Sequence, residues 1–589
     1  MSNETAPSRA WTFPTSPRSP HKIKPELELL SQLVDKTWTR SSGQIEFSRL
    51  LSDSGEFEGD GSKKDPTFSA RDRTRAPKQL GLIEVRKVSK IPVLSITAAG
   101  QELLNLSEGE EASFFLNQIA KVQYPSVQHN AGCYAEMDCR PLTISIVILQ
   151  SVGSITKEEF GLFVNTCTHL DDVDDSIAGI QDFRSRLRKS TPGAPRKILR
   201  NELRKERIRN VYAQDLASGS TGLREGGKNF VKTKFNTLMD YADASIRYLL
   251  STGIFRIDVD GKTFSINPSK ADLATQLVED LGLGSNYKSE ARNTYITDYL
   301  GNPAQPELSI YDVSSQSKRV AAELKGSPKS EVDRIKNELA LIPHGFQRET
   351  FLERCLAEKR QAQRAAQSQR VAYERALIGP EIDKVFDSII DRNSDLLDRP
   401  LYLEWNIWRA FSALNDCVVA NGNFRSDADG NPIGTASGKM PDLVIEYSDF
   451  WLAVEVTLSS GLRQYESEHE SIFRHVGQLQ ASRIADNDPR PVYGMFIAPN
   501  IHDSVTACVL SNSRYKHVVY GGPVRIVPVT LAAFREFFNN NCGADAPQSS
   551  VLHQAIQSLF SEVGNTAFTE VDWKDKINAT ITQLSLVIN

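Results

Sequence analysis

Residues 441–457 read Pro441-Asp442-Leu-Val-Ile-Glu-Tyr-Ser-Asp-Phe-Trp-Leu-Ala-Val-Glu455-Val-Thr457, a pattern that predicts a β-hairpin. If Ser448-Asp449 forms a two-residue turn, Asp442 lies directly opposite Glu455. Directly opposed residues share one face of a sheet, with Cβ atoms roughly 4.5–5.5 Å apart. The other face is then continuously apolar and suited to a core; it carries Leu443, Ile445, Tyr447, Phe450, Leu452, Val454 and Val456.

The facing carboxylates Asp442 and Glu455 supply hard oxygen ligands of the kind that Mg²⁺ prefers. Their spacing is that of PD-(D/E)xK nucleases, although Thr457 stands where that pattern has lysine. A cation at this place stabilises charge on the phosphate. The positive charge of the missing lysine could be replaced by Lys439, Arg463, Arg474 or a second metal. The same short pattern also arises by chance, so the hairpin alone leaves the function open.

The chain has 589 residues, which corresponds to about three to five domains. Its seven cysteines include no Cys-x-x-Cys pair, which argues against a disulfide framework. No apolar run approaches the roughly 18 residues needed to cross a membrane. We therefore expect a cytoplasmic protein with no membrane partner.

Basic residues concentrate between positions 184 and 234, where fifteen Lys and Arg face four Asp and Glu, although the whole chain has a net charge of −5. A local basic field predicts contact with nucleic-acid phosphates. The alternative is a solvated charged loop with no ligand.

The segments before residue 284 predict two DNA-reading subdomains. Near 68–104 the order is helix, strand, turn, strand, helix, with Thr97 as N-cap of the last helix. A helix over 230–251 followed by strands near 254–257 and 263–267 repeats the helix-plus-hairpin order. We assign winged-helix-like subdomains to 1–150 and 151–284.

The rest of the chain predicts a helical linker over 285–380 and a catalytic domain over 381–589. A polar helix over 353–375, ended by Gly379-Pro380, is typical of a spacer. A helix over 381–414, the hairpin, a helix over 461–485, a strand over 492–498, a helix near 502–511 and a strand over 524–530 follow. This order indicates an α/β sandwich, giving a multidomain α+β and α/β protein.

Four glutamates on helices are expected beside the hairpin: Glu404 on the first helix of the last domain, and Glu466, Glu468 and Glu470 after Thr457. Any one of them is more often a solvated surface residue than a ligand. An extra glutamate here is able to complete a metal shell or orient a water.

Several longer segments then carry a family resemblance: 16–27, Phe68-Ser-x-Arg71-Asp-Arg73, 123–129, 299–303, Glu455-Val-Thr457 and 496–499. With them the chain resembles, over nearly its full length, the AlwI-like type IIS restriction endonucleases, most of all the BstNBI-type nicking endonucleases. Family members also carry Glu-Val-Thr at the place of Glu455-Val-Thr457, so Thr457 fits the family pattern.

The resemblance implies catalytic residues Glu404, Asp442, Glu455 and Glu468, with Glu466 and Glu470 as alternatives to Glu468. Mg²⁺, or Mn²⁺ in its place, would be held by Asp442, Glu455 and Glu468. The substrate would be double-stranded DNA. Predicted DNA contacts, from the resemblance and from the basic stretch, are Arg18, Lys22, Arg71, Arg73, Arg75, Lys228, Lys232 and Lys234.

The resemblance further implies cleavage of one or both strands at a fixed distance from a short asymmetric site. Cutting both strands would involve a second nuclease subunit or a transient homodimer. The alternative function is a DNA-binding protein with an inactive nuclease domain.

Overall fold

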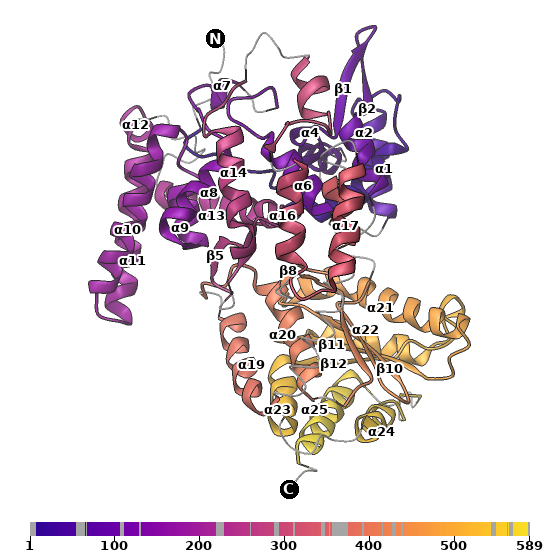
Figure 1. Cartoon of the computed structure of the whole chain (residues 1–589). Helices are drawn as coiled ribbons and strands as arrows, with labels where there is room; N and C mark the ends of the chain where they lie inside the picture. Colours follow the sequence, from indigo (N-terminus) through magenta and orange to yellow (C-terminus); the bar gives the residue numbers. More distant parts are fainter. Residues whose placement is uncertain are drawn as a thin grey trace. The chain divides into compact units, whose positions relative to one another are not determined.

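A computed structural model describes most of the chain, which divides into two compact units, Met1–Lys359 and Arg360–Asn589 (Figure 1). The described residues are 8–54, 65, 67–106, 111–128, 131–219, 229–258, 261–287, 294–309, 312–342, 348–352, 354–355, 375–391, 394–414, 416–426, 432–436, 440–542, 549–561, 563–564 and 569–586. Within them no helix combines the length and the apolar character needed to cross a membrane.

The first unit is mainly helical, with two small sheets. Its elements are η1 (Pro20–Lys22), α1 (Ile23–Ser31), α2 (Gly43–Asp53), α3 (Phe68–Arg73), α4 (Arg75–Gln79), β1 (Ile83–Val88), β2 (Ile91–Ile96), α5 (Ala98–Asn105), α6 (Glu111–Ala120), α7 (Ala131–Tyr134), α8 (Pro141–Val152), β3 (Ser154–Thr156), α9 (Lys157–Glu159), η2 (Phe160–Val164), η3 (Leu170–Asp172), α10 (Val173–Lys189), α11 (Ala194–Val211), α12 (Ala213–Ala217), α13 (Phe230–Leu250), β4 (Phe255–Ile257), β5 (Thr263–Ile266), η4 (Pro268–Lys270), α14 (Ala271–Leu281), η6 (Tyr295–Leu300), α16 (Val313–Glu323) and α17 (Lys329–Leu341).

Strands β1 and β2 form the antiparallel ribbon expected near 82–97, and it projects from the rest of its unit (Figure 1). Thr97 caps α5 as predicted, because its side chain accepts a hydrogen bond from the Gly100 backbone N–H. Ser89 and Lys90, both at positive φ, make the two-residue turn at the tip. The predicted order of elements is therefore present, and the winged-helix assignment stays a prediction.

The second helix-plus-hairpin unit, α13 with β4 and β5, has a third strand that the sequence did not indicate. Strand β3 pairs antiparallel with β5, so the sheet order is β3-β5-β4. β3 is only three residues long, too short to show a period of two.

The basic stretch folds largely into α10 and α11, and part of its charge is neutralised inside the unit. Glu158, which is buried, receives the guanidinium groups of Arg200 and Arg204. Arg184 lies 2.7 Å from Glu159. These ion pairs fasten the helices to α9 and leave only the outward basic residues for a ligand.

Helices α16 and α17 lie in the segment predicted to be a helical linker, and they enclose a small core. Val320, Leu324, Ile335, Leu339 and Leu352 are buried together. Most of the predicted polar helix over 353–375 lies outside the described residues.

The second unit contains α19 (Arg375–Ile390), α20 (Arg399–Leu414), β6 (Val419–Gly422), β7 (Arg425–Ser426), β8 (Pro432–Gly434), β9 (Leu443–Glu446), β10 (Trp451–Val456), α21 (Leu462–Ala485), β11 (Val492–Ala498), α22 (Asp503–Arg514), η8 (Val518–Tyr520), β12 (Ile526–Thr530), α23 (Leu531–Asn541), α24 (Ser549–Phe560) and α25 (Glu570–Leu586).

Two helix boundaries predicted before the hairpin are wrong. Gly379-Pro380 does not end a helix, since Pro380 lies inside α19, whose Ile382, Phe386 and Ile389 are fully buried. Tertiary packing of this apolar face outweighs the lost backbone hydrogen bond. The predicted continuous helix over 381–414 is two helices, α19 and α20.

The hairpin has the predicted register. Trp451 pairs with Glu446 and Val454 with Leu443, which leaves Ser448-Asp449 as the turn. Strands β11 and β12 add in parallel on one side and β6 in antiparallel on the other, giving a mixed sheet of order β12-β11-β10-β9-β6. The helix over 461–485 and the strand over 492–498 are also confirmed.

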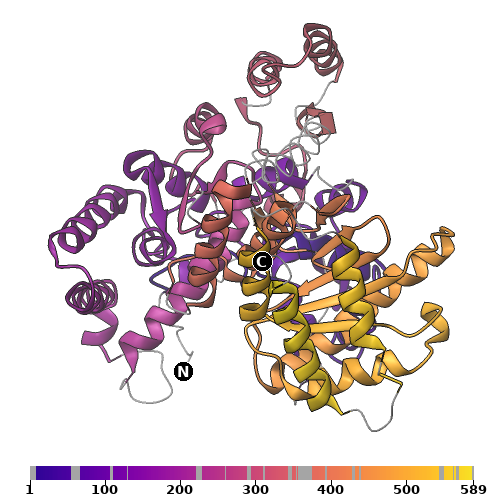
Figure 2. The same cartoon turned by 90° about the horizontal axis from the view of Figure 1, so that it is seen from below.

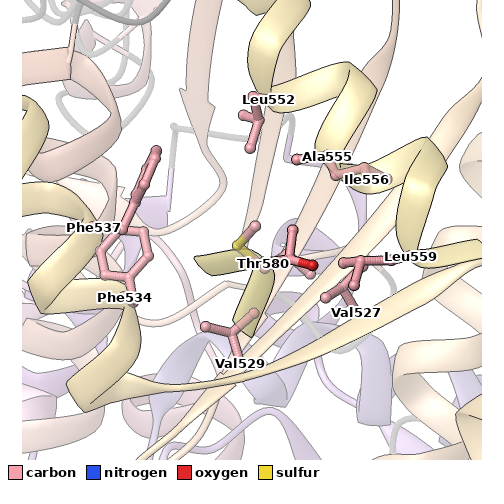
Figure 3. A pocket seen from close by; sticks show the side chains of 10 residues that line it. Val527, Val529, Phe534, Phe537, Leu552, Ala555, Ile556, Leu559 and Thr580 are labelled. Carbon is pink, nitrogen blue, oxygen red and sulfur yellow. The ribbon is translucent and has the colours of Figure 1, made fainter. Parts of the chain in front are cut away.

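Helices cover both faces of this sheet. On one face, a Cβ added at Gly494 of β11 would collide with Val476 of α21, so only glycine allows α21 to pack this closely. On the other face Met495, Val527 and Val529 meet α23, α24 and α25, whose yellow ribbons lie over the strands in Figure 2. Figure 3 shows the apolar cavity of about 30 Å³ that remains between them, room for about one water. The sequence prediction missed these three helices.

Candidate active site

Asp442 directly precedes β9, and the hairpin register brings it opposite Glu455 near the end of β10. The last recorded pair is Leu443 with Val454, so the next position outward joins Asp442 and Glu455. Asp442 Oδ2 accepts a hydrogen bond from the Val456 backbone N–H at 2.8 Å. The neighbouring strand thus fixes the orientation of this carboxylate.

Glu455 is held by a residue that the sequence prediction did not include. His475 of α21 is 4% exposed, and its Nδ1 lies 2.6 Å from Glu455 Oε1. Glu455 faces α21 because it shares the face of Gly494, while Val454 points to the opposite core. The available sequence signal was spacing: His475 is seven residues, about two helical turns, after Glu468.

Among the three glutamates of α21, the structure brings Glu468 to the hairpin. Its Oε1 accepts hydrogen bonds from Thr457 Oγ1 at 2.9 Å and from Ser459 Oγ at 3.3 Å. Glu466 and Glu470 are exposed, and Glu470 pairs with Arg474. Thr457, at the lysine position of the pattern, therefore orients a carboxylate.

Glu404 reaches the same cluster from α20. It is buried, and its Oε2 accepts a hydrogen bond from the Ala436 backbone N–H at 3.0 Å. Burial raises the pKa of Glu404 well above its usual value, and the nearby charge of Asp442 raises it further. The carboxyl is therefore protonated over a wider pH range than an exposed glutamate.

The cluster is electrostatically costly. Burial and then the charge of Glu455 raise the pKa of Asp442 well above its ordinary value, and burial followed by the charge of Glu468 does the same for Glu455. Arg474 opposes this shift, since its charge lowers the pKa of Glu455. Arg474 is thus a cation within electrostatic reach, whereas Lys439 lies outside the described residues.

The donor set fits a hard divalent cation. Within the described residues Asp442 Oδ1 and Glu455 Oε2 accept no hydrogen bond, so each carboxylate keeps one oxygen for a ligand. A cation between them would relieve the repulsion that raises both pKa values. Among the described residues no three His, Cys, Asp or Glu side chains are gathered as a ready-made metal cage. Mg²⁺ commonly keeps waters and needs only one or two carboxylates.

The predicted DNA-contact residues of the first unit occupy different settings. Arg18 pairs with Asp240 and Asp243, Arg71 with Asp65, and Arg73, 18% exposed, with Glu26. Arg75, with a side chain 65% exposed, lies 3.7 Å from Asp72. Asp240, Asp65 and Asp72 are carboxylates near the surface, whose ion pairs with these arginines are weak enough for a phosphate to replace, whereas Asp243 is mostly buried.

The remaining predicted contacts are Lys22, which lies outside the basic stretch, and three lysines within it. Lys22 ends η1, and Lys232 is exposed on α13. Lys234 packs its ammonium over the rings of Tyr212 and Phe230. Lys228 lies outside the described residues. The contact of these lysines with DNA stays a prediction.

A cluster of carboxylates with raised pKa values beside a hairpin, on a sheet covered by helices, is a candidate functional site. The chain belongs to the AlwI restriction endonuclease family, whose model matches residues 78–537. That membership supports a sequence-specific endonuclease and confirms the family resemblance.

Three solved structures show weak similarity. The small subunit (R.BspD6I2) of the heterodimeric restriction endonuclease R.BspD6I is 20% identical, with a TM-score of 0.28, covering 36% of this chain and 100% of that chain. Restriction endonuclease FokI is 13% identical, with a TM-score of 0.23, and the match covers 90% of this chain and 96% of that chain. The structure of FokI bound to DNA is 10% identical, with a TM-score of 0.20, and the match covers 85% of this chain and 83% of that chain. No curated protein matched the chain.

Proposed function

We propose that this protein is a Mg²⁺-dependent type IIS endonuclease. Its first unit binds a short asymmetric DNA sequence, and its second unit hydrolyses a phosphodiester at a fixed distance from that sequence. The observation that carries the proposal is the cluster of Asp442, Glu455, Glu468 and Glu404, in which Glu404 and Glu455 are buried, found in a chain of a restriction endonuclease family.

Each residue of the cluster has a proposed part. Asp442 and Glu455 hold the cation directly and Glu468 completes its shell, with Mn²⁺ able to replace Mg²⁺. A bound divalent cation supplies Lewis-acid stabilisation of charge on the phosphate and makes a bound water more acidic. His475 fixes the orientation of Glu455, and Thr457 that of Glu468.

Glu404 and Arg474 complete the chemistry. Because its pKa is raised, Glu404 holds its proton to higher pH than an exposed glutamate, and in that form it donates a hydrogen bond to a water or a phosphate oxygen. Arg474 supplies the positive charge that the missing lysine of the PD-(D/E)xK pattern would otherwise provide.

Among the described residues, one such cluster lies in the second unit, and each cluster acts on one phosphodiester. We therefore propose that a single chain nicks one strand of double-stranded DNA. Cutting both strands then requires a second nuclease subunit or a transient homodimer, because the strands run in opposite directions and present their phosphates to opposite sides.

Incubation of supercoiled plasmids of varied sequence with the protein and Mg²⁺ tests the proposal. The wild type converts them to nicked or linear forms at defined positions, and EDTA stops the reaction. Asp442→Ala and Glu468→Gln lower the rate by about 100-fold or more, since each loses a group required for the chemistry. Both variants keep DNA binding.

Glu466→Gln is the matched control, because Glu466 is exposed on the same helix two residues from Glu468. It should cut at the wild-type rate. Specific binding by a folded wild type, with no cutting under any metal condition, would instead support the DNA-binding protein with an inactive nuclease domain. Equal losses in Glu466→Gln and Glu468→Gln would contradict the assignment of Glu468.

A further inference from the structure

An open cleft of about 860 Å³ lies in the first unit at the base of the β1–β2 ribbon. One wall is β1, from Ile83 to Lys87, together with Lys78 of α4; the other is formed by Val127, Gln128, Thr294, Ile296 and Thr297. A second hollow of about 380 Å³ shares Thr294 and continues past Tyr287 and Tyr299. Together they form the ribbon cleft, named here for its place beside β1.

Two segments that carry the family resemblance, 123–129 and 299–303, meet at this cleft. Gln123 Nε2 donates to the Tyr295 hydroxyl at 2.9 Å, and Gln123 Oε1 accepts from the Asn286 backbone N–H at 2.9 Å. Gln123 is fully buried. A buried, satisfied amide of this kind rigidifies the wall beside it.

Residues 302–305, which follow the wall segment that contains Thr294 and Tyr299, are hydrogen-bonded to α6 and to Lys121 directly after it. Lys121, also fully buried, donates to the Asn302 carbonyl at 2.8 Å, and Asn117 donates to the carbonyls of Pro303 and Gln305. Gly81, at φ +69°, allows Leu300 to pack where a Cβ would collide with it. The cleft is therefore built on preorganised walls, as a recognition site requires.

The side chains that line the cleft suit a nucleic-acid strand. Lys78, Arg86 and Lys87 face one carboxylate, Glu84, which pairs with Arg86 at 2.8 Å. Lys78 has no carboxylate within salt-bridge distance among the described residues, and burial lowers its pKa. Gln128 is half-buried, and its side-chain amide makes no hydrogen bond within the described part of the chain.

We propose that the ribbon cleft is the surface with which the protein reads its DNA site. One strand of the duplex lies along the cleft, with phosphates on Lys78, Arg86 and Lys87. The β1–β2 ribbon enters the adjoining groove, since a two-stranded ribbon fits the major groove. The Gln128 amide contacts a base edge, and adenine is its natural partner because an amide matches N6 and N7. This inference rests on the proposed endonuclease function.

Cleavage of a randomised DNA library, followed by sequencing of the cut ends, tests whether the Gln128 side-chain amide reads a base. The wild type gives a short motif at a fixed offset. Gln128→Leu loses the preference at one base pair by about 5- to 150-fold, while the offset is unchanged because the nuclease unit is untouched. Gln128→Glu keeps the side-chain volume and shifts the preference at that pair towards cytosine, whose N4 amino group donates to a carboxylate.

The lysines are tested by binding at several salt concentrations. Lys78→Gln and Lys87→Gln leave the motif unchanged, weaken binding to all sequences alike, and each lower the log–log salt slope by about 1. Lys516→Gln, an exposed lysine of the second unit, is the control and should leave motif, affinity and slope as in the wild type. Thermal unfolding checks that every variant is folded.

Folded Gln128 and lysine variants that match the wild type in motif, affinity and salt slope would overturn the ribbon cleft and leave the endonuclease proposal intact. A wild type that cuts no DNA would overturn the endonuclease proposal instead. In that event, binding to random-sequence duplex still tests the cleft, because the lysine variants must lower the salt slope and the control must not.

Discussion

Replacing Asp442 by asparagine should make the metal-free protein more stable while it removes cleavage. Asp442 and Glu455 occupy opposed positions of the hairpin, and both pKa values are raised because two carboxylates are buried together. Asparagine removes one charge at nearly the same volume. Its side-chain oxygen is still able to accept the hydrogen bond from the Val456 backbone N–H.

Coulomb's law gives the size of the effect. Two charges about 5 Å apart, as directly opposed strand positions allow, repel by about 3 kcal/mol at an effective dielectric constant of about 20. Part of this repulsion is already relieved by proton uptake in the wild type, so we expect a gain of about 1–3 kcal/mol. For a unit of this size, each kcal/mol raises Tm by about 2–4 °C.

Differential scanning calorimetry in EDTA, repeated from pH 4 to pH 9, measures the gain. Because the folded-state pKa of Asp442 is raised above its ordinary value of 3.8, its contribution to stability is fully present below that value and is lost as pH rises through the raised pKa. The Tm difference between Asp442→Asn and the wild type should therefore be absent near pH 4 and grow as pH rises.

Mg²⁺ should reverse the order of the two Tm values, so that the wild type becomes more stable than Asp442→Asn. Binding to the wild type raises its Tm in proportion to ln(1 + [Mg²⁺]/Kd), while the variant has lost a ligand and responds less. As a control, Glu466→Gln removes an exposed carboxylate of α21 and should leave Tm unchanged at every pH. An Asp442→Asn protein less stable than the wild type at pH 8 in EDTA would refute the repulsion argument.

Two further predictions concern the first unit, and urea unfolding monitored by circular dichroism measures both. Glu158→Ala should destabilise it by about 3 kcal/mol, since Arg200 and Arg204 lose their buried partner, and unchanged stability would show that the pairs do not fasten α11. Leu339→Ala should cost about 2–5 kcal/mol if α16 and α17 share a real core; a cost near zero would instead fit a solvated spacer.

The sequence by itself determined the hairpin and much of the sheet around it. A two-residue turn with alternating apolar residues permits one register in which the core face is continuous, and that register is observed. The strand over 492–498, a short apolar run, and the helix over 461–485 are also observed where the sequence predicts them. Local chemistry was also sufficient for the Thr97 cap.

The tertiary structure alone decided which helical residues join the site. Glu466, Glu468 and Glu470 are chemically identical in the sequence, and only the packing of α21 against β10 and β11 turns Glu468 and His475 towards the hairpin. The break between α19 and α20 and the continuation of α19 through Pro380 depend in the same way on burial against neighbouring elements.

The basic stretch shows the same division in electrostatic terms. Its charge is a property of the composition, but which guanidinium groups remain for a ligand depends on Glu158 and Glu159, buried carboxylates that lie before the stretch in the chain. Alternation and capping act between neighbours and can be read from the sequence. Burial and ion pairing join residues far apart in the chain, so only the folded structure reveals them.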